Sequence, residues 1–564
     1  MSDDPRDPPE NEKEPSEAEG LLHAPGIDIE TTATKYDRLK GDRRALPPLR
    51  RLDVLVLLVL LLATGATRFI RLGEPGKVLP ANDLTCVQDP PLGKTCYEPI
   101  PTDEVHYIPD ARDVLRYGTE SDNRIGQPDG AYVVHPPVGK WFIAAGMKLF
   151  GDRPFGWRFF GAVFGTFSVL IMYLLAMRLW GSPWWAAAAG TLLASDGLWF
   201  VQSRIAMLDI YVSVFILAGM WLLVVDRDVT HPDHRGLRWW RIAAGVMFGF
   251  ALATKWDALP FIAVGIATTL AWDAFRSRDA TDRRFAYKVG GVFGALVLLP
   301  IAIYIASYTP WFLDSHRYNP PLCDSRTTTF SFGVFHLGGV AGKWLCYQHQ
   351  VYDFHSNLAK YETVKDDTTG QQVRRPAHPY YGNAWTWPWI GRPVAHYYSS
   401  TGSGTDQREA EVLGLPNPLI WWPGFFIGFL ALAWWSFKKD STASFLFALF
   451  IAGWFPFLIL GDAFGKPVFM FYATPLVPYV VLTVVHVLYR AVHRWPVLVW
   501  YAVGYIVACV GGFAYFYPIL AALPIPYGGA FGWARHIWFS DRFHFLWLKG
   551  DCTAQNKIKL LCWI

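Results

Sequence analysis

The stretch that decides the fold is residues 52–70, LDVLVLLVLLLATGATRFI, an apolar run that leads into a long polar segment. A helix of about 20 apolar residues crosses the hydrocarbon core of a bilayer, so this run predicts a membrane span. Residues 1–50 are rich in Pro, Asp, Glu and Lys, and Arg43, Arg44, Arg50 and Arg51 lie just before the apolar run. Such a segment cannot bury enough apolar surface to fold, and basic residues beside a span favour its cytoplasmic side. We therefore expect a disordered cytoplasmic tail followed by an uncleaved membrane anchor.

The rest of the chain repeats this apolar pattern. Of its 564 residues, 52% are hydrophobic and only 17% are charged, whereas soluble domains have about 25% charged residues. We predict about eleven spans, each near the length that a bilayer requires. Their ranges are 52–70, 156–180, 184–201, 207–225, 240–254, 258–275, 285–308, 419–437, 444–460, 468–489 and 497–517. The chain is thus expected to be a polytopic α-helical membrane protein.

The distribution of Lys and Arg predicts the orientation of these spans. The loops that follow 207–225, 258–275, 419–437 and 468–489 are basic, and the short loops between them on the other side contain few cations. Basic loops stay in the cytoplasm, so an odd number of spans places the C-terminus outside. We expect a location in the plasma membrane. The net charge of +4 is small, and we expect no nucleic-acid partner.

This topology leaves two large extracytoplasmic loops. The first, 71–154, lies within an N-terminal membrane block, 51–309, and the second is 310–417. A four-helix membrane block, 418–517, and an aromatic tail, 518–564, complete the predicted domains. The apolar run 140–150 is too short to span and is expected to lie in the membrane interface.

Cysteine positions agree with this assignment. Six of them fall in pairs within outside segments, where disulfides can form. The pairs are Cys86 with Cys96, Cys323 with Cys346, and Cys552 with Cys562. Unrelated thiols are the alternative, because spacing alone cannot establish connectivity.

Several common signatures are absent from the sequence. It has no P-loop, no dinucleotide-binding fingerprint, and no Cys or His spacing typical of zinc sites. No soluble nucleotide-sugar domain fits between the spans. If a sugar is transferred, its donor is therefore expected to be a polyprenyl-phosphate sugar already in the membrane.

Two adjacent carboxylates in the first loop are the best candidates for catalysis. They lie in Thr102-Asp103-Glu104-Val105-His106-Tyr107. Phosphate is a good leaving group, so an inverting displacement needs one base for the acceptor hydroxyl. Asp103 is the predicted base, and Glu104 is expected to orient its surroundings or contact sugar hydroxyls. Neighbours on a helix diverge by about 100°, which disfavours a symmetric dyad. The alternative is a helix N-terminus that merely favours acids.

Further polar residues fall near the outer ends of spans. Asp209 lies at the start of one, where an ionisable group is costly and usually marks a polar cavity. Arg204 is a candidate for the carrier phosphate, with a structural pair to Asp209 as the alternative. Lys255 could bind the lipid phosphate or simply extend to the interface. His135 and Lys140 flank a rigid Pro-Pro turn, where the histidine could equally be an ordinary turn residue.

The second loop contributes His378 in His-Pro-Tyr-Tyr, and Trp385 and Trp387 in Trp-Thr-Trp-Pro-Trp. Aromatic side chains at this density stack on sugar faces, and they also form a belt at lipid headgroups. Both interpretations remain open.

Taken together, these motifs resemble the protein O-mannosyltransferase family (glycosyltransferase family 39) in its bacterial form. The motifs are Asp103-Glu104-Val-His, His135-Pro-Pro-Val-Gly-Lys140, Arg204-x-x-x-x-Asp209, Thr254-Lys255-Trp256, and His378-Pro-Tyr-Tyr with Trp385-x-Trp387-Pro. The resemblance implies a GT-C fold and inverting transfer of mannose from polyprenyl-phosphate-mannose to Ser or Thr of a translocated protein. It maps the family's base to Asp103 and its second acid to Asp209.

Two departures accompany the resemblance. Thr102 replaces the aromatic residue that usually precedes the acidic pair, and residues 309–417 are too few for the β-trefoil module of eukaryotic members. The implied partners are the lipid donor, secreted or membrane acceptor proteins, the membrane and the protein translocon. We expect no metal requirement, although other GT-C enzymes hold a divalent cation between acids. The alternatives are transfer of another sugar to a lipid or wall glycan, and lipid or sugar transport.

Overall fold

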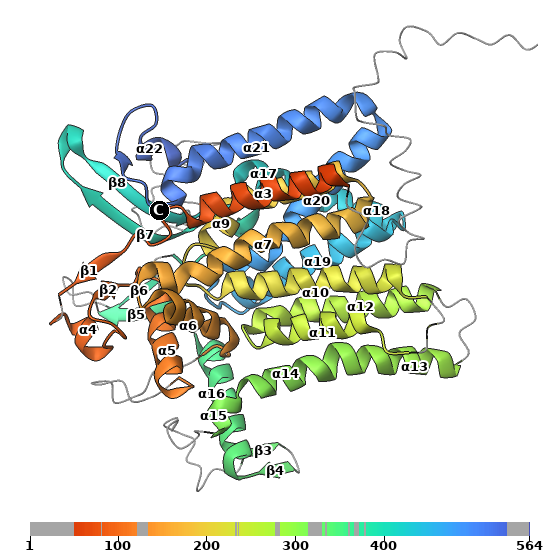
Figure 1. Ribbon diagram of the computed structural model, residues 1–564, viewed down its shortest axis with the longest axis horizontal. Helices are drawn as coiled ribbons and strands as arrows, with labels where there is room; N and C mark the ends of the chain where they lie inside the picture. The colour runs from red at the N-terminus through yellow and green to blue at the C-terminus, as the bar shows by residue number, and fades with distance from the viewer. Residues whose placement is uncertain are drawn as a thin grey trace, which may run out of the picture.

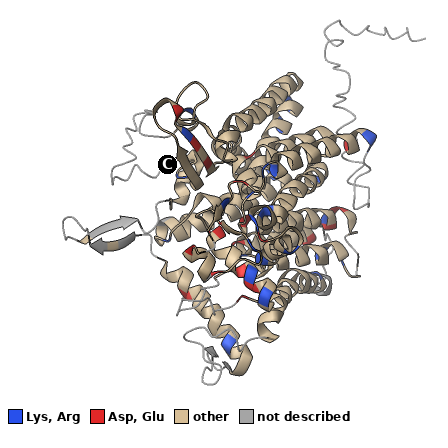
Figure 2. Ribbon diagram, turned by 60° about the vertical axis from the view of Figure 1, so that its left-hand side comes forward, with Lys and Arg blue, Asp and Glu red and all other residues tan. Residues whose placement is uncertain are grey.

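The computed structural model is a bundle of roughly parallel helices with its larger loops gathered at one end (Figure 1). We call this end the loop end. The structure describes residues 50–80, 82–120, 134–231, 234, 236–276, 282–313, 330–332, 335–358, 361–365, 372–376, 380–538 and 563. Most of the helical ribbon carries neither Lys, Arg, Asp nor Glu (Figure 2). The predicted tail, 1–50, lies outside the described residues except for Arg50.

Within the described residues, nine helices are long and apolar enough to cross a membrane. They are Arg51–Phe69 (α3), Pro154–Trp180 (α7), Asp209–Val229 (α10), Trp256–Phe275 (η1 and α12), Ala286–Ser307 (within α13, η2 and α14), Pro418–Phe437 (α17, η5 and α18), Ser441–Gly461 (α19 and part of η6), Met470–Arg494 (η7 and α20) and Pro496–Leu520 (η8 and α21). All nine coincide with predicted spans. A multi-pass membrane protein is therefore confirmed, while eleven crossings remain a prediction.

The other two predicted spans form helices that are shorter than these nine. The run 240–254 forms α11 (Trp239–Leu252), an apolar helix of 14 residues. The run 184–201 is not one helix but two, α8 (Pro183–Ala194) and α9 (Gly197–Gln202). They separate at Asp196, whose side chain accepts a hydrogen bond from the Trp199 N–H and so begins a new helix. An N-cap residue inside an apolar run is the signal that hydropathy alone overlooked.

Helix α10 lies at the centre of the bundle. It packs against α7, α11 and η7 (Met470–Leu476). Of its most apolar stretch of 18 residues, 94% is buried. A helix that is apolar all round is stable in such a position because no face has to meet water. Its first residue, Asp209, is fully buried at the loop end, so α10 positions a carboxylate there.

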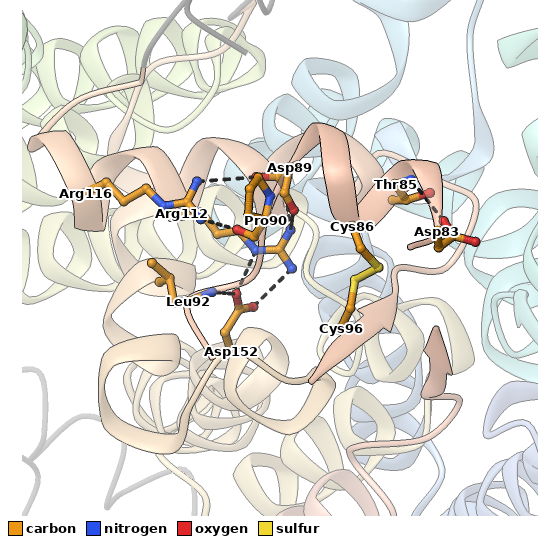
Figure 3. Close-up of a disulfide and its surroundings, with 10 residues drawn as sticks. All are labelled: Asp83, Thr85, Cys86, Asp89, Pro90, Leu92, Cys96, Arg112, Arg116 and Asp152. Atoms are coloured by element: carbon orange, nitrogen blue, oxygen red, sulfur yellow. Dashed lines mark hydrogen bonds and ion pairs between the residues drawn. A yellow bond between two sulfur atoms is a disulfide. The ribbon is translucent and has the colours of Figure 1, made fainter. Parts of the chain in front are cut away.

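The first loop is held together by covalent and ionic links. Its elements are β1 (Lys77–Leu79), α4 (Leu84–Gln88), β2 (Cys96–Glu98), α5 (Glu104–Tyr117) and α6 (Val138–Phe150). The predicted Cys86–Cys96 disulfide is present (Figure 3). The Arg112 side chain of α5 forms ion pairs with Asp89 and with Asp152, the latter at 2.7 Å from Nε to Oδ2. These links fix α5 against α6 and the start of α7.

The second loop and the tail complete the loop end. Their elements are α15 (Thr309–Leu313), β3 (Phe330–Phe332), β4 (Phe335–Leu337), α16 (Gly339–Asn357), β5 (Tyr361–Lys365), β6 (Gln372–Pro376), η3 (Ala384–Trp389), β7 (Val394–Thr401), η4 (Gly404–Asp406), β8 (Arg408–Gly414), β9 (Ile525–Pro526) and α22 (Trp533–His536). Cys346 is disulfide-bonded, while Cys323, Cys552 and Cys562 lie outside the described residues. Strands β7, β8 and β9 form one antiparallel sheet in that order.

Candidate active site

The start of α5 separates the two adjacent carboxylates. Asp103 is the N-cap residue of α5, but its side chain makes no capping hydrogen bond. Glu104 is the first helical residue, and it is completely buried, whereas Asp103 is half-buried. The acids therefore occupy different environments, and Asp103 is not simply an acid that caps a helix.

Glu104 is bound on every side by donors. Its carboxylate forms a two-pronged ion pair with Arg158 of α7, with Nε–Oε1 and Nη2–Oε2 distances of 2.9 Å. It also accepts backbone hydrogen bonds from Ile100 at 2.9 Å and from Ala206 at 3.0 Å. Although burial alone would raise the pKa of Glu104, the Arg158 charge and these hydrogen bonds lower it below its usual value. Glu104 thus joins α5, α7 and the segment before α10.

Asp103 has much weaker contacts. Its Oδ2 accepts one hydrogen bond, from the Tyr107 hydroxyl at 3.3 Å, and no Lys or Arg of the described residues pairs with it. Burial raises the pKa of Tyr107 well above its usual value, and the negative charges of Asp103 and Asp209 raise it further. Tyr107 therefore stays protonated and can donate to Asp103. The remaining lone pairs of Asp103 are available to a hydroxyl group.

A buried lysine lies beside these acids. Lys255, in the turn before α12, forms ion pairs with Asp209 at 2.9 Å and with Asp257 at 3.3 Å. Its Nζ lies 4.5 Å from the ring centroid of Tyr472, within the range of a cation–π contact. Burial would lower the pKa of Lys255, but the two carboxylates raise it above its usual value. The second oxygen of Asp209, Oδ2, is buried without a hydrogen-bond partner.

Two histidines adjoin this group. The ring of His135 lies 6.1 Å from the ring of Tyr107 and 5.5 Å from that of His355 in α16. The His355 ring in turn lies 6.4 Å from Trp256. Burial lowers the pKa of His135 well below its usual value, and the positive charges of Lys255, His355 and Lys140 lower it further. His135 is therefore neutral at physiological pH and can act as a hydrogen-bond donor or acceptor rather than as a cation.

The side chains of two other predicted residues, Lys140 and Arg204, are bonded to other groups of the protein. Lys140 is buried and forms ion pairs with Asp110 at 3.1 Å and Glu120 at 3.0 Å. Arg204 donates hydrogen bonds to the carbonyl groups at the end of α3, namely those of Thr67, Arg68, Ile70 and Arg71. These contacts satisfy carbonyls that a helix C-terminus leaves unpaired.

The aromatic residues of the second loop divide between surface and core. Trp385 is 47% exposed, whereas Trp387 is buried and packs against Phe457. His378 lies outside the described residues.

Sequence reasoning did not identify Arg158, Tyr472 or His355. An arginine near the start of an apolar span is costly, and this could have revealed Arg158. Tyr472 and His355 carry no local signal, since only the fold brings them to Asp103 and Lys255.

We call Asp103, Tyr107, Asp209, Lys255, Asp257 and Tyr472 the Asp103 cluster. Among the described residues, no group of three His, Cys, Asp or Glu side chains is arranged to hold a metal ion. A membrane helix bundle with an available carboxylate and a buried lysine at its loop end agrees with the class of protein that the sequence predicts, an integral-membrane glycosyltransferase of the GT-C type.

Comparisons with known proteins identify the family within this class. Residues 130–315 match the family described as dolichyl-phosphate-mannose-protein mannosyltransferase. A polyprenol-phosphate-mannose–protein mannosyltransferase of Mycolicibacterium smegmatis is 32% identical over 77% of this chain and 86% of its own length. The protein of the same name from Corynebacterium glutamicum is 32% identical over 67% and 75%. The chain therefore belongs to the protein O-mannosyltransferase family.

A solved structure agrees with this assignment at the level of the fold. The S. cerevisiae Pmt1–Pmt2 complex bound to the sugar donor is similar with a TM-score of 0.63 and 14% identity. The similarity covers 87% of this chain and 92% of the yeast chain. The predicted GT-C fold is thus confirmed.

Proposed function

We propose that this enzyme transfers mannose from polyprenyl-phosphate-mannose to Ser or Thr hydroxyls of proteins, by a single inverting displacement with Asp103 as the base. The observation that supports it most is the difference between the adjacent acids. The Glu104 carboxylate accepts hydrogen bonds from four N–H donors, while the Asp103 carboxylate accepts only one hydrogen bond, from the Tyr107 hydroxyl. A base needs free lone pairs within reach of the hydroxyl that it deprotonates.

Besides a base, the reaction requires a group that stabilises the leaving phosphate and groups that bind the sugar and the acceptor. As the acceptor oxygen attacks the anomeric carbon, its proton passes to Asp103 and the bond from that carbon to the phosphate oxygen breaks. Lys255 is the cation of the Asp103 cluster, and we assign it to the phosphate because a charge-assisted hydrogen bond stabilises the leaving anion. Asp209 and Asp257 hold its ammonium group in place. His135 and Trp385 are proposed to contact the sugar or the acceptor.

The other predicted residues are assigned to positioning. The contacts of Glu104, Lys140 and Arg204 fix α5, α6 and the end of α3. Trp387 is assigned to the support of η3, and His378 keeps its predicted role in substrate binding. We propose that the loop end faces the outside of the plasma membrane, with the N-terminus in the cytoplasm, so that the site meets polypeptides leaving the translocon.

Membranes that contain the enzyme should transfer labelled mannose from polyprenyl-phosphate-mannose to a Ser/Thr peptide, and Asp103→Asn should abolish the transfer. Label in a lipid acceptor but not in peptide would contradict the proposal. Labelling of a cysteine introduced at Asp103 by a membrane-impermeant thiol reagent tests the orientation in intact cells. Reaction only after permeabilisation would refute the proposed outside location.

A further inference from the structure

The hairpin of β7 and β8 has one covered edge and one open edge. Along β8, the C-terminal segment adds β9, and two further backbone hydrogen bonds form, from Ala522 N–H to the Glu411 carbonyl at 2.9 Å and from Tyr527 N–H to the Gln407 carbonyl at 3.0 Å. Strand β7 is at the other end of the strand order, and in the described part of the chain β8 is its only strand neighbour. Its far edge therefore presents backbone N–H and carbonyl groups without a ladder partner.

This open edge lacks the usual protection. Natural edge strands carry Lys, Pro or inward charges that prevent another strand from pairing. The sequence of β7, VAHYYSST, has no Lys, Arg, Asp, Glu or Pro and is rich in residues that favour strands. Its outer half is accessible, with Tyr398 48% exposed and Ser400 and Thr401 also exposed. Such an edge is suited to strand addition.

The inner end of β7 shares neighbouring residues with the Asp103 cluster. His396 is buried, with its Nε2 3.2 Å from Nε2 of Gln202. Only four residues after Gln202, the Ala206 N–H binds the Glu104 carboxylate. On another side, the ring of Phe471 lies 5.8 Å from His396 and 5.7 Å from the Lys255 ammonium group. The same short segment thus supports β7 and the residue beside Asp103.

From these observations we infer that the acceptor polypeptide binds in an extended conformation as an added strand along the open edge of β7. The inference rests on the proposed function, which supplies the occupant: a polypeptide whose hydroxyl must reach Asp103. An extended chain presents alternate side chains to one face, and main-chain hydrogen bonds to a sheet edge bind it without requiring a particular sequence. One edge could therefore serve many acceptors.

An N-methyl scan of a Ser/Thr acceptor peptide tests this mode without changing the enzyme. In an added strand only every second N–H faces the sheet, so methylation should raise the acceptor KM at alternate positions on one side of the target residue. Loss of one hydrogen bond should raise it about fivefold, while the donor KM stays unchanged. Equal effects at neighbouring positions, or none at any position, would overturn the inference. The unmodified peptide tests the proposed function separately, because its mannosylation does not depend on the binding mode.

Substitutions in β7 provide a second, independent test. Of Ser399 and Ser400, one directs its N–H to β8 and the other to the open edge, because the directions alternate along a strand. Of Ser399→Pro and Ser400→Pro, the variant that removes the N–H facing β8 should lower the thermal midpoint. The variant that removes the N–H facing the open edge should raise only the acceptor KM. Ser400→Ala controls for the loss of the Ser400 hydroxyl bond to Glu409. If the edge instead mediates pairing with a second copy of the chain, a proline variant would abolish a dimer and leave the acceptor KM unchanged, which would refute the inference.

Discussion

Replacing each of the adjacent acids by its amide should separate stability from catalysis. In Glu104→Gln, an amide N–H₂ replaces one oxygen of a carboxylate that faces both prongs of Arg158. Two donors then face each other, and the buried guanidinium loses its counter-charge. Breaking one partner of a buried ion pair costs about 3–5 kcal/mol, so the thermal midpoint in detergent should fall clearly.

Asp103→Asn should instead leave the stability nearly unchanged and greatly lower the turnover. Asp103 is half-buried and accepts only the Tyr107 hydrogen bond at 3.3 Å, which an asparagine oxygen can still accept. The free energy of unfolding should change by less than about 1 kcal/mol. The turnover should fall by about 10²–10⁴-fold, the contribution that is typical of a general base, while binding of the donor lipid persists.

The two measurements are a thermal-shift assay and mannose transfer to a peptide at saturating donor concentration. Arg158→Lys is a matched control for Glu104→Gln, because it retains the charge but loses the two-pronged geometry. The reasoning fails if Asp103→Asn retains more than a tenth of the activity, or if Glu104→Gln is as stable as the wild type but inactive. The second result would make Glu104 the better candidate for the base.

Four further predictions follow from the same contacts. Lys255→Met should raise the donor KM about tenfold or more through loss of a charge-assisted hydrogen bond, and Lys255→Arg should restore part of the affinity; an unchanged donor KM would exclude Lys255 from phosphate binding. Reduction of the Cys86–Cys96 disulfide, or its replacement by two serines, should destabilise the protein by about 3 kcal/mol, as expected for a short loop, which a thermal shift with and without reductant can detect. Burial lowers the pKa of His396 from 6.5 to about 3, so the folded state holds its ring neutral. The free energy of unfolding should therefore be highest above about pH 6.5 and decrease as the pH falls, by about 2 kcal/mol at pH 5. His396→Gln should flatten this pH dependence of the thermal midpoint. EDTA should leave mannose transfer unchanged, whereas loss of activity that Mg²⁺ or Mn²⁺ restores would show a metal requirement.

The sequence predicted those parts of the structure that depend on apolar length. Nine predicted spans match helices because a hydrocarbon core demands about 20 apolar residues whatever lies around them. The break at Asp196 escaped notice because it depends on a single capping side chain inside an apolar run. The Cys86–Cys96 disulfide was predicted because both cysteines fall in one outside loop, whereas their spacing alone left the connectivity open.

The site was predictable in its residue types but not in its pairings. Asp103 stood out as one of two adjacent carboxylates in the first loop, and Asp209 and Lys255 as polar residues near the ends of spans. The fold brings all three to one place. The roles suggested for Glu104 and Arg204 could not anticipate their partners, because Arg158 and the carbonyls at the end of α3 lie far away in the sequence. The presence of His355 and Tyr472 in this region depends on helix packing that no local pattern encodes.

The contacts of Glu104 also impose an order on biogenesis. The acid emerges from the ribosome before Arg158 and before Ala206, yet it needs both of them. A nascent chain that ends before Arg158 contains both adjacent acids but none of the donors that hold Glu104 against α7 and the segment before α10. The start of α5 therefore reaches its final geometry only after the segment that leads into the central helix has been synthesised.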